Sequence, residues 1–173
     1  METQTLTVLI TVPLVIVIVA LLWLGWRSRK RRQADVERLP LVPQQLTPAT
    51  VVAEGQYVAT TSAGDWLDRI AVQGMGIRTN AELSVHDEGV LFDRAGAAPV
   101  FIPRSDLREG RLASGMAGKF VEKDGLLVIS WKLGARELDT GFRSRQAADK
   151  MLLLAALQEL ISAAPQADAD SGK

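Results

Sequence analysis

The chain has 173 residues, with 20 lysines and arginines balanced by 20 aspartates and glutamates, one histidine and no cysteine. This length accommodates one domain of ordinary size and excludes a two-domain enzyme with a large interdomain cleft. Without cysteine there is no disulfide framework, thiolate nucleophile or Cys-ligated metal, and a single His86 argues against zinc sites and a Ser-His-Asp triad. We therefore expect a protein that is not an enzyme, with no catalytic residue, metal or cofactor.

An uncharged stretch of 21 residues runs from Leu6 to Trp26 and consists mainly of Leu, Val and Ile. At a rise of about 1.5 Å per residue, a helix of this length spans the roughly 30 Å hydrocarbon core of a bilayer. Pro13 lies in its first third and is tolerated in membrane helices. Trp23 and Trp26 lie at its end, where aromatic rings anchor to headgroups. We predict a transmembrane helix that contacts the lipid bilayer.

A cluster of five basic residues follows this stretch directly. These residues are Arg27, Arg29, Lys30, Arg31 and Arg32. A cleaved signal peptide would carry its basic residues first, before a shorter apolar segment, whereas here the preceding charge is the negative Glu2. This order is that of a retained anchor, and the positive-inside rule places the C-terminal domain in the cytoplasm and the N-terminus outside. We expect a single-pass protein of the cell (inner) membrane. The basic cluster either sets only the topology of the protein or also binds anionic lipid headgroups.

Beyond the basic cluster the charge balance becomes acidic. Residues 33–173 carry 15 of the 20 basic residues and 19 of the 20 acidic ones, a net charge of −4 by subtraction. A domain of this sign has no general attraction to phosphate backbones, so we expect no nucleic-acid partner.

The chain divides into four parts, of which residues 1–32 are the anchor with its basic cluster. Residues 33–53 contain three prolines and little periodicity, which predicts a linker outside the core. Residues 54–163 are the predicted folded domain, and the polar tail of residues 164–173 is expected to be disordered.

The predicted domain consists of short strands followed by one helix. Apolar alternation and turn residues predict about seven antiparallel strands, from eight candidate segments at 57–61, 68–73, 81–85, 90–92, 100–102, 107–113 (the weakest signal), 126–133 and 136–142. Helical spacing begins after Ser144, which we predict as the N-cap. We expect this C-terminal helix to pack Leu152, Leu153 and Leu157 against the sheet.

This order of elements, together with three segments, resembles the bacterial pleckstrin-homology-like (PH-like) domains. The segments are AELSVHDEGV at 81–90, FIP at 101–103, and WKLG at 131–134 running into LDTGFR at 138–143. The chain is similar, more narrowly, to single-pass membrane-anchored PH-like proteins of actinobacteria, which are often encoded beside pyrimidine-biosynthesis genes and have no assigned activity. The resemblance implies an α+β, mainly β fold, a PH-like barrel of two near-orthogonal sheets capped by the helix. That fold hosts lipid binders, peptide binders and scaffolds, so it does not identify a ligand.

Three motifs resemble those of enzymes or nucleotide-binding sites, but each lacks residues that the corresponding chemistry requires. Asp-Thr-Gly at 139–141 matches aspartic proteases, but that chemistry needs two carboxylates and this triplet ends a strand. In residues 113–120, Ala113 and Phe120 stand where a phosphate loop needs a glycine and a Ser or Thr hydroxyl. Residues 74–79 lack the third glycine of a dinucleotide-binding fingerprint, where Thr79 stands instead. We interpret these segments as strand ends and loops, and His86 as an exposed turn residue.

Trp66, Lys119 and Lys123 are the candidate contacts of a ligand or partner. Trp66 follows a Gly-Asp turn and either anchors a partner or covers the barrel edge, whereas Trp131 lies in an alternating strand and is expected in the core. Lys119 and Lys123 make a glycine-containing loop basic, which favours either docking of an anionic headgroup or a solvated hairpin tip.

These observations predict a binding or scaffold module. We expect a membrane-tethered cytoplasmic PH-like module that engages a protein partner at the inner membrane face, because an acidic domain with exposed strand edges suits such a partner. One alternative is recognition of anionic lipid headgroups by the basic loop and the basic cluster. Another is service as an accessory subunit of a membrane transport complex.

Overall fold

The computed structural model describes residues 12–25 and 36–163, and the chain divides into two units, residues 1–35 and 36–173, each described here by itself. In the first unit, residues 12–25 form a helix whose side chains, including those of Pro13 and Trp23, are exposed. No helix among the described residues is both long enough and apolar enough to cross a membrane. Other parts of the predicted anchor and the predicted tail lie outside the described residues: Leu6, Trp26, Arg27, Arg29, Lys30, Arg31, Arg32 and residues 164–173.

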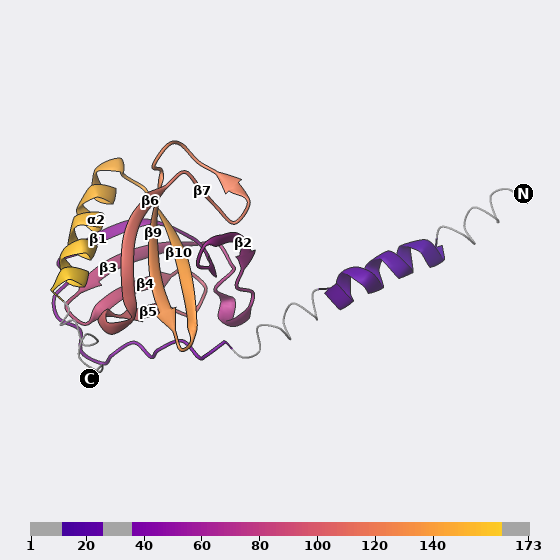
Figure 1. Cartoon of the computed structure of the whole chain (residues 1–173), viewed down its shortest axis with the longest axis horizontal. Helices are drawn as coiled ribbons and strands as arrows, with labels where there is room; N and C mark the ends of the chain where they lie inside the picture. The colour runs from indigo at the N-terminus through magenta and orange to yellow at the C-terminus, as the bar shows by residue number, and fades with distance from the viewer. Residues whose placement is uncertain (1–11, 26–35, 164–173) are drawn as a thin grey trace, which may run out of the picture. The chain divides into compact units, whose positions relative to one another are not determined.

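The second unit is built around one antiparallel sheet (Figure 1). Its strands are ordered β5-β4-β3-β1-β10-β9-β6, β2 pairs with β1, and β7 and β8 form a separate two-stranded hairpin. Helix α2 follows the last strand, which confirms the predicted order of strands first and a helix last. The bounds are β1 Val51–Ser62, β2 Asp65–Arg69, η1 Val72–Gly74, β3 Thr79–His86, β4 Gly89–Arg94, β5 Val100–Pro103, η2 Arg104–Asp106, β6 Leu107–Ala113, β7 Gly115–Met116, β8 Lys119–Phe120, β9 Leu126–Leu133, β10 Arg136–Ser144 and α2 Ala147–Ser162.

Strand β1 belongs to both halves of the sheet. Its residues 51–57 pair with β3, and its residues 55–62 pair with β10 across an irregularity between Tyr57 and Ala59. Such a bulge bends a strand and increases its twist. Gly55 pairs with both neighbours, and a Cβ at this position would overlap the backbone of Arg143. Glycine is therefore required where the two halves meet.

The core contains a chain of buried hydrogen bonds that runs in one direction. The indole nitrogen of Trp131 donates to Thr140 Oγ1 at 2.9 Å, and Thr140 and Thr60 share a hydrogen bond of 2.8 Å. The Thr60 hydroxyl bonds to the Tyr57 hydroxyl at 2.6 Å, which donates to the carbonyl oxygen of Met75 at 2.8 Å. Because an indole only donates and a carbonyl only accepts, each hydroxyl between them donates once in the direction of Met75. Trp131 is fully buried, as predicted.

Helix α2 packs chiefly on β6 and also contacts β1 and β10. Its buried residues are Leu153, Ala156, Leu157 and Leu160. Gly110 of β6 lies beneath the helix, where a Cβ would come within 3.4 Å of the Leu157 Cβ. A side chain of that size would make an ordinary van der Waals contact, so the helix lies directly on this strand, and the predicted packing of Leu153 and Leu157 is confirmed.

Two details of the helix prediction are wrong. Ser144 is the last residue of β10, where it pairs with Gly55, so the helix begins at Ala147 with Gln146 at the N-cap position and no side-chain cap. Leu152 is 58% exposed because it lies about a quarter turn around the helix from the buried side. The apolar run therefore covers more of the helix surface than the sheet can bury.

Residues 36–50, predicted as part of a linker outside the core, lie against the domain. Val36 is a member of the core, and Leu39 packs against it. The side chain of Gln73 donates to the carbonyl oxygen of Glu37 and accepts from the backbone N–H of Leu39, each at 2.7 Å. The linker prediction is wrong for this part because Val36 is buried, Leu39 is partly buried, and the Gln73 side chain hydrogen-bonds to the backbone of the segment.

The segment between β1 and β3 departs most from the predicted strands. A strand was expected at 68–73, but β2 ends at Arg69 and the chain then forms the turn η1. Ile70 and Met75 flank this turn and are fully buried, while Gln73 within it has a positive φ of 54°. Ile70 of the expected strand therefore fills the core together with Met75, and Val72 packs against it.

Candidate functional site

Three large apolar side chains are exposed together where β2 meets the β7–β8 hairpin. Trp66, Leu67 and Phe120 are 41%, 58% and 80% exposed, and we call them the apolar patch. The rings of Trp66 and Phe120 lie 5.6 Å apart between centroids. A Cβ at Gly118, in the hairpin turn, would lie 3.9 Å from the Leu67 side chain. Exposed apolar side chains gathered in this way mark interaction sites more often than isolated ones do.

The hairpin that carries part of this patch is fixed to the domain by backbone contacts. Ala117 and Gly118 adopt positive φ angles of 54° and 77°, which make the tight turn. The Ala117 N–H donates to the Trp66 carbonyl at 2.8 Å, and the Arg69 guanidinium donates to the Ala117 carbonyl at 3.0 Å. Met116 is buried on Leu126 and Val128, which form a second small core. The patch is therefore presented on a supported surface, as a binding site requires.

The structure brings two of the three sequence candidates to the same place. Trp66 contacts the hairpin, and Lys119 belongs to β8, next to Phe120. Lys123 is exposed in the turn that follows. Sequence reasoning missed Leu67 and Phe120, and the available signal was an aromatic residue directly after a lysine in a glycine-containing loop.

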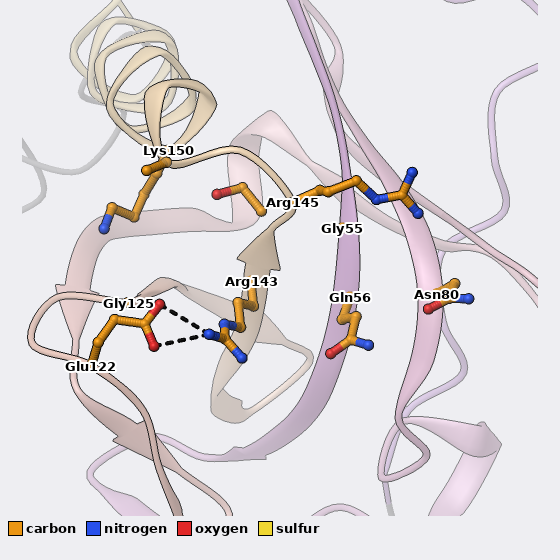
Figure 2. A pocket seen from close by; sticks show the side chains of 10 residues that line it. Gly55, Gln56, Asn80, Glu122, Gly125, Arg143, Arg145 and Lys150 are labelled. Atoms are coloured by element: carbon orange, nitrogen blue, oxygen red, sulfur yellow. Dashed lines mark hydrogen bonds and ion pairs between the residues drawn. The ribbon is translucent and has the colours of Figure 1, made fainter.

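A second feature is a cavity of about 340 Å³ between the end of β10, the start of α2 and the loop that contains Lys123 (Figure 2). Three cations line it, Arg143, Arg145 and Lys150, against one carboxylate, Glu122. The other lining residues are Gly55, Gln56, Asn80, Gly125, Ser144 and Ala147. The charged groups at this cavity therefore sum to a positive value, although the domain as a whole is acidic.

The cations of this cavity already have partners within the domain. Arg143 donates to both carboxylate oxygens of Glu122, at 3.1 and 2.9 Å, as the dashed lines of Figure 2 show. Hydrogen bonds from its own backbone N–H and from Arg143 hold the pKa of Glu122 below its usual value. Lys150 donates to the carbonyl of Asp124, and Arg145 extends toward β3 and pairs with Glu54 at 2.6 Å. An anion would have to compete with these contacts.

His86, predicted as an exposed turn residue, is buried. Its ring lies between the Thr47 carbonyl, 2.7 Å from Nδ1, and the Ser84 hydroxyl, 2.9 Å from Nε2. The Glu88 carboxylate accepts from both the backbone N–H and the hydroxyl of Thr47, and the backbone hydrogen bond lowers the pKa of Glu88. The prediction is wrong because residues 36–50 fold over this hairpin, and His86 helps to hold them there.

The aspartate of the Asp-Thr-Gly triplet, Asp139, is buried and hydrogen-bonded to neighbouring strands. Asp139 is 5% exposed and accepts from Arg111 at 2.7 Å and from the Ser130 hydroxyl at 2.6 Å. These contacts join β10, β6 and β9 across the sheet. The interpretation of the triplet as the end of a strand is corrected in one respect, since Asp139 lies inside β10.

Comparisons with known proteins agree with this architecture. Residues 36–158 match the family model described as Bacterial PH domain-like, and no curated protein matches. Among solved structures, the chain resembles one in "The 8S snRNP Assembly Intermediate", with 5% identity and a TM-score of 0.50, covering 79% of this chain and 97% of that chain.

Two structures of Vav1, one bound by an allosteric inhibitor and one an apo activated truncation, match with 17% and 15% identity and TM-scores of 0.39 and 0.41. Each match covers 79% of this chain and 32% of that chain, so the chain spans about a third of their length. The snRNP likeness, at 5% identity, concerns the fold alone. The family match extends over most of the chain, including residues 36–50, and the chain belongs to the bacterial PH domain-like family.

Proposed function

We propose that the chain is a membrane-tethered binding module whose PH-like domain docks a protein partner through the apolar patch. The observation that carries the proposal is the joint exposure of Trp66 and Leu67 of β2 and of Phe120 of the β7–β8 hairpin, two segments joined by the hydrogen bond from the Ala117 N–H to the Trp66 carbonyl. Aromatic side chains dominate the binding energy of protein interfaces, particularly where a supported surface holds them in place.

The chemistry of the partner follows from the residues around the patch. Lys119 precedes Phe120 in β8, and Lys123 is exposed in the following turn. A partner that fits this surface offers apolar side chains flanked by carboxylates, because apolar groups bury against the rings and charge complementarity aids association.

The tether rests on the N-terminal sequence. An uncharged stretch from Leu6 to Trp26, followed by five basic residues, has the length and flanks of a single-pass anchor with the domain in the cytoplasm. The helix of residues 12–25 lies within this stretch and exposes its apolar side chains. The resemblance to actinobacterial membrane-anchored PH-like proteins supports the same arrangement.

The proposal is tested by photocrosslinking in intact cells with the full chain. A benzophenone side chain at position 120 is expected to form a discrete protein adduct, and Leu67→Asp is expected to abolish it. Leu41→Asp is the matched control, because Leu41 is 91% exposed and belongs to a different segment. The adduct peptide, made synthetically, should bind the purified chain and lose affinity when its carboxylates are replaced by amides. Adducts no stronger than those from a benzophenone at position 41 would overturn the proposal.

A second candidate is recognition of an anionic headgroup, favoured by the three cations of the cavity beside the loop of Lys123. In this case residues 33–173 should bind vesicles that contain phosphatidylserine, and binding should weaken with salt. Arg143→Gln with Lys150→Gln should abolish binding, while Lys132→Gln, an exposed cation of β9, should not. Because residues 33–173 carry a net charge of −4, we expect weak binding or none, with attachment supplied by the anchor.

A further inference from the structure

Helix α2 is apolar on the side that faces away from the sheet. Its exposed residues include Ala148, Met151, Leu152 and Ala155, and Met151 and Leu152 are 56% and 58% exposed. This spacing of three, four and seven residues forms one stripe along about two turns. A helix that is apolar on both sides is ordinarily covered on both sides, and the domain covers only the side of Leu153 and Leu157.

We infer that a second copy of this chain covers the stripe, through antiparallel pairing of the two α2 helices about a two-fold axis. The stripe is symmetric about the midpoint between Met151 and Leu152. Antiparallel pairing places Ala148 opposite the second copy's Ala155 and Met151 opposite the second copy's Leu152. The small side chains at each end leave room for close approach, and the large ones fill the centre. Such an interface is self-complementary, as two-fold symmetry requires.

The charges at the two ends of the stripe favour the same orientation. Arg145 lies just before the helix, and its side chain is 68% exposed although it pairs with Glu54 of the same copy, while Glu159 is exposed near the C-terminal end of the helix. In the same register, antiparallel pairing places Arg145 opposite the second copy's Gln158, one residue from its Glu159, at both ends of the interface. Parallel pairing would instead place arginine beside arginine and glutamate beside glutamate. Charge complementarity of this kind selects orientation and partner.

The small size of the stripe makes the strength of pairing depend on the concentration of the chain. Eight residues from Ala148 to Ala155 span only about 12 Å of helix. Four exposed side chains over this length give a contact much smaller than the roughly 1,200 Å² of surface that stable interfaces bury in total. Pairing in dilute solution is therefore weak. Two chains held in one membrane face each other at a much higher effective concentration, and this step rests on the proposed tether. In Figure 1, α2 lies on the opposite side of the unit from β2, so pairing leaves the apolar patch free.

The absence of cysteine makes disulfide trapping in the full chain a direct test. Two copies carrying Leu152→Cys should crosslink on oxidation in membranes, because position 152 lies next to the axis. Ala148→Cys alone should crosslink poorly, since equivalent residues are about 10 Å apart along the helices. Ala148→Cys mixed with Ala155→Cys should crosslink efficiently. Ala135→Cys, in the exposed turn between β9 and β10, measures random collision.

Charge reversal checks the orientation. Arg145→Glu and Glu159→Arg should each reduce trapping of Leu152→Cys severalfold, and the two combined should restore it. Glu54→Gln is the control for the Arg145–Glu54 pair within one copy and should not reduce trapping. Trapping of Leu152→Cys no stronger than that of Ala135→Cys overturns the inference, and so does equally strong trapping through Ala148→Cys alone. Loss of membrane retention with trapping preserved at high protein concentration would refute the tether and leave the pairing intact.

Discussion

The backbone N–H of Ala117 donates a 2.8 Å hydrogen bond to the carbonyl oxygen of Trp66, two residues that are 51 positions apart in the chain. This bond joins the β7–β8 hairpin to β2 and places Phe120 beside Trp66. A strand that exposes Trp66 and Leu67 and a hairpin that exposes Phe120 thereby form a single surface. The proposed docking site depends on this contact, because neither segment alone presents more than two of the three apolar side chains.

Phe120→Ala should separate binding from folding. The ring is 80% exposed, so we expect the free energy of unfolding, from urea titration, to change by less than about 0.5 kcal/mol. Affinity for the adduct peptide should fall tenfold or more, because truncation of a residue that anchors an interface typically costs about 2 kcal/mol or more. Unchanged affinity would remove Phe120 from the binding surface.

Met116→Ala, in contrast to Phe120→Ala, should lower the free energy of unfolding. Met116 is 3% exposed and packs on Leu126 and Val128 beneath the hairpin. Removal of a buried methionine side chain costs about 2 to 5 kcal/mol, and here we expect the lower part of that range because the cluster is small. Hydrogen exchange should show the Ala117 amide losing protection. A variant with the native free energy of unfolding and native protection would show that the hairpin is held by its backbone contacts alone.

Leu157→Ala and Leu152→Ala should differ sharply in stability. Leu157 is fully buried against the sheet, so its truncation should cost about 2 to 5 kcal/mol, a large part of the stability of a domain this size. Leu152 is 58% exposed, so its truncation should change the free energy of unfolding by less than about 0.5 kcal/mol. Urea titrations of both variants at low protein concentration, where pairing is absent, provide the measurement. Equal losses would contradict the observed orientation of α2.

Alkaline pH should destabilise the domain through Tyr57, the single tyrosine of the chain. Burial raises its pKa from 10.0 to about 12, against smaller opposing effects of Thr60 and Arg94. Below pH 10 both the folded and the unfolded states carry the neutral phenol, so there is no effect. Between pH 10 and about 12 the unfolded state loses the proton first, and the free energy of unfolding falls, in total by about 2 to 3 kcal/mol.

The ultraviolet absorbance of the phenolate measures this titration without interference from other tyrosines. We expect the folded protein to titrate well above pH 10, and Tyr57→Phe to abolish the phenolate signal and flatten this part of the stability profile. Tyr57→Phe should also be less stable at neutral pH, because the hydrogen bonds to Thr60 and the Met75 carbonyl are lost. Titration of the folded protein at pH 10 would mean that the phenol is accessible to water.

Much of the fold follows from local sequence. Alternation of apolar residues identified β3, β4, β5, β9 and β10, because one face of each strand must be buried whatever the topology. The apolar run after Ser144 identified α2 for a similar reason. The length and flanks of the N-terminal stretch likewise define the predicted anchor, since bilayer thickness and charge asymmetry are properties of a linear segment.

Other features depend on which segments meet in space. Leu152 and Leu153 are neighbours with the same side chain, and only the orientation of α2 on β6 decides which one is buried. His86 is buried because Thr47, 39 residues earlier, lies against it. A local pattern contains no information about either contact.

The apolar patch is the clearest case. Trp66 could be singled out as a large residue beside a turn, but its surroundings are decided by a hairpin that folds back from between β6 and β9. Met116 pairs with Lys119, the residue before Phe120, so Phe120 lies on the opposite face of the hairpin from Met116, which is buried on Leu126 and Val128. Sequence alone determined that the chain has an apolar N-terminal stretch, a β-rich domain and a final helix. Tertiary packing decided which apolar side chains remained at the surface, because the sheet and the small second core have room for only some of them.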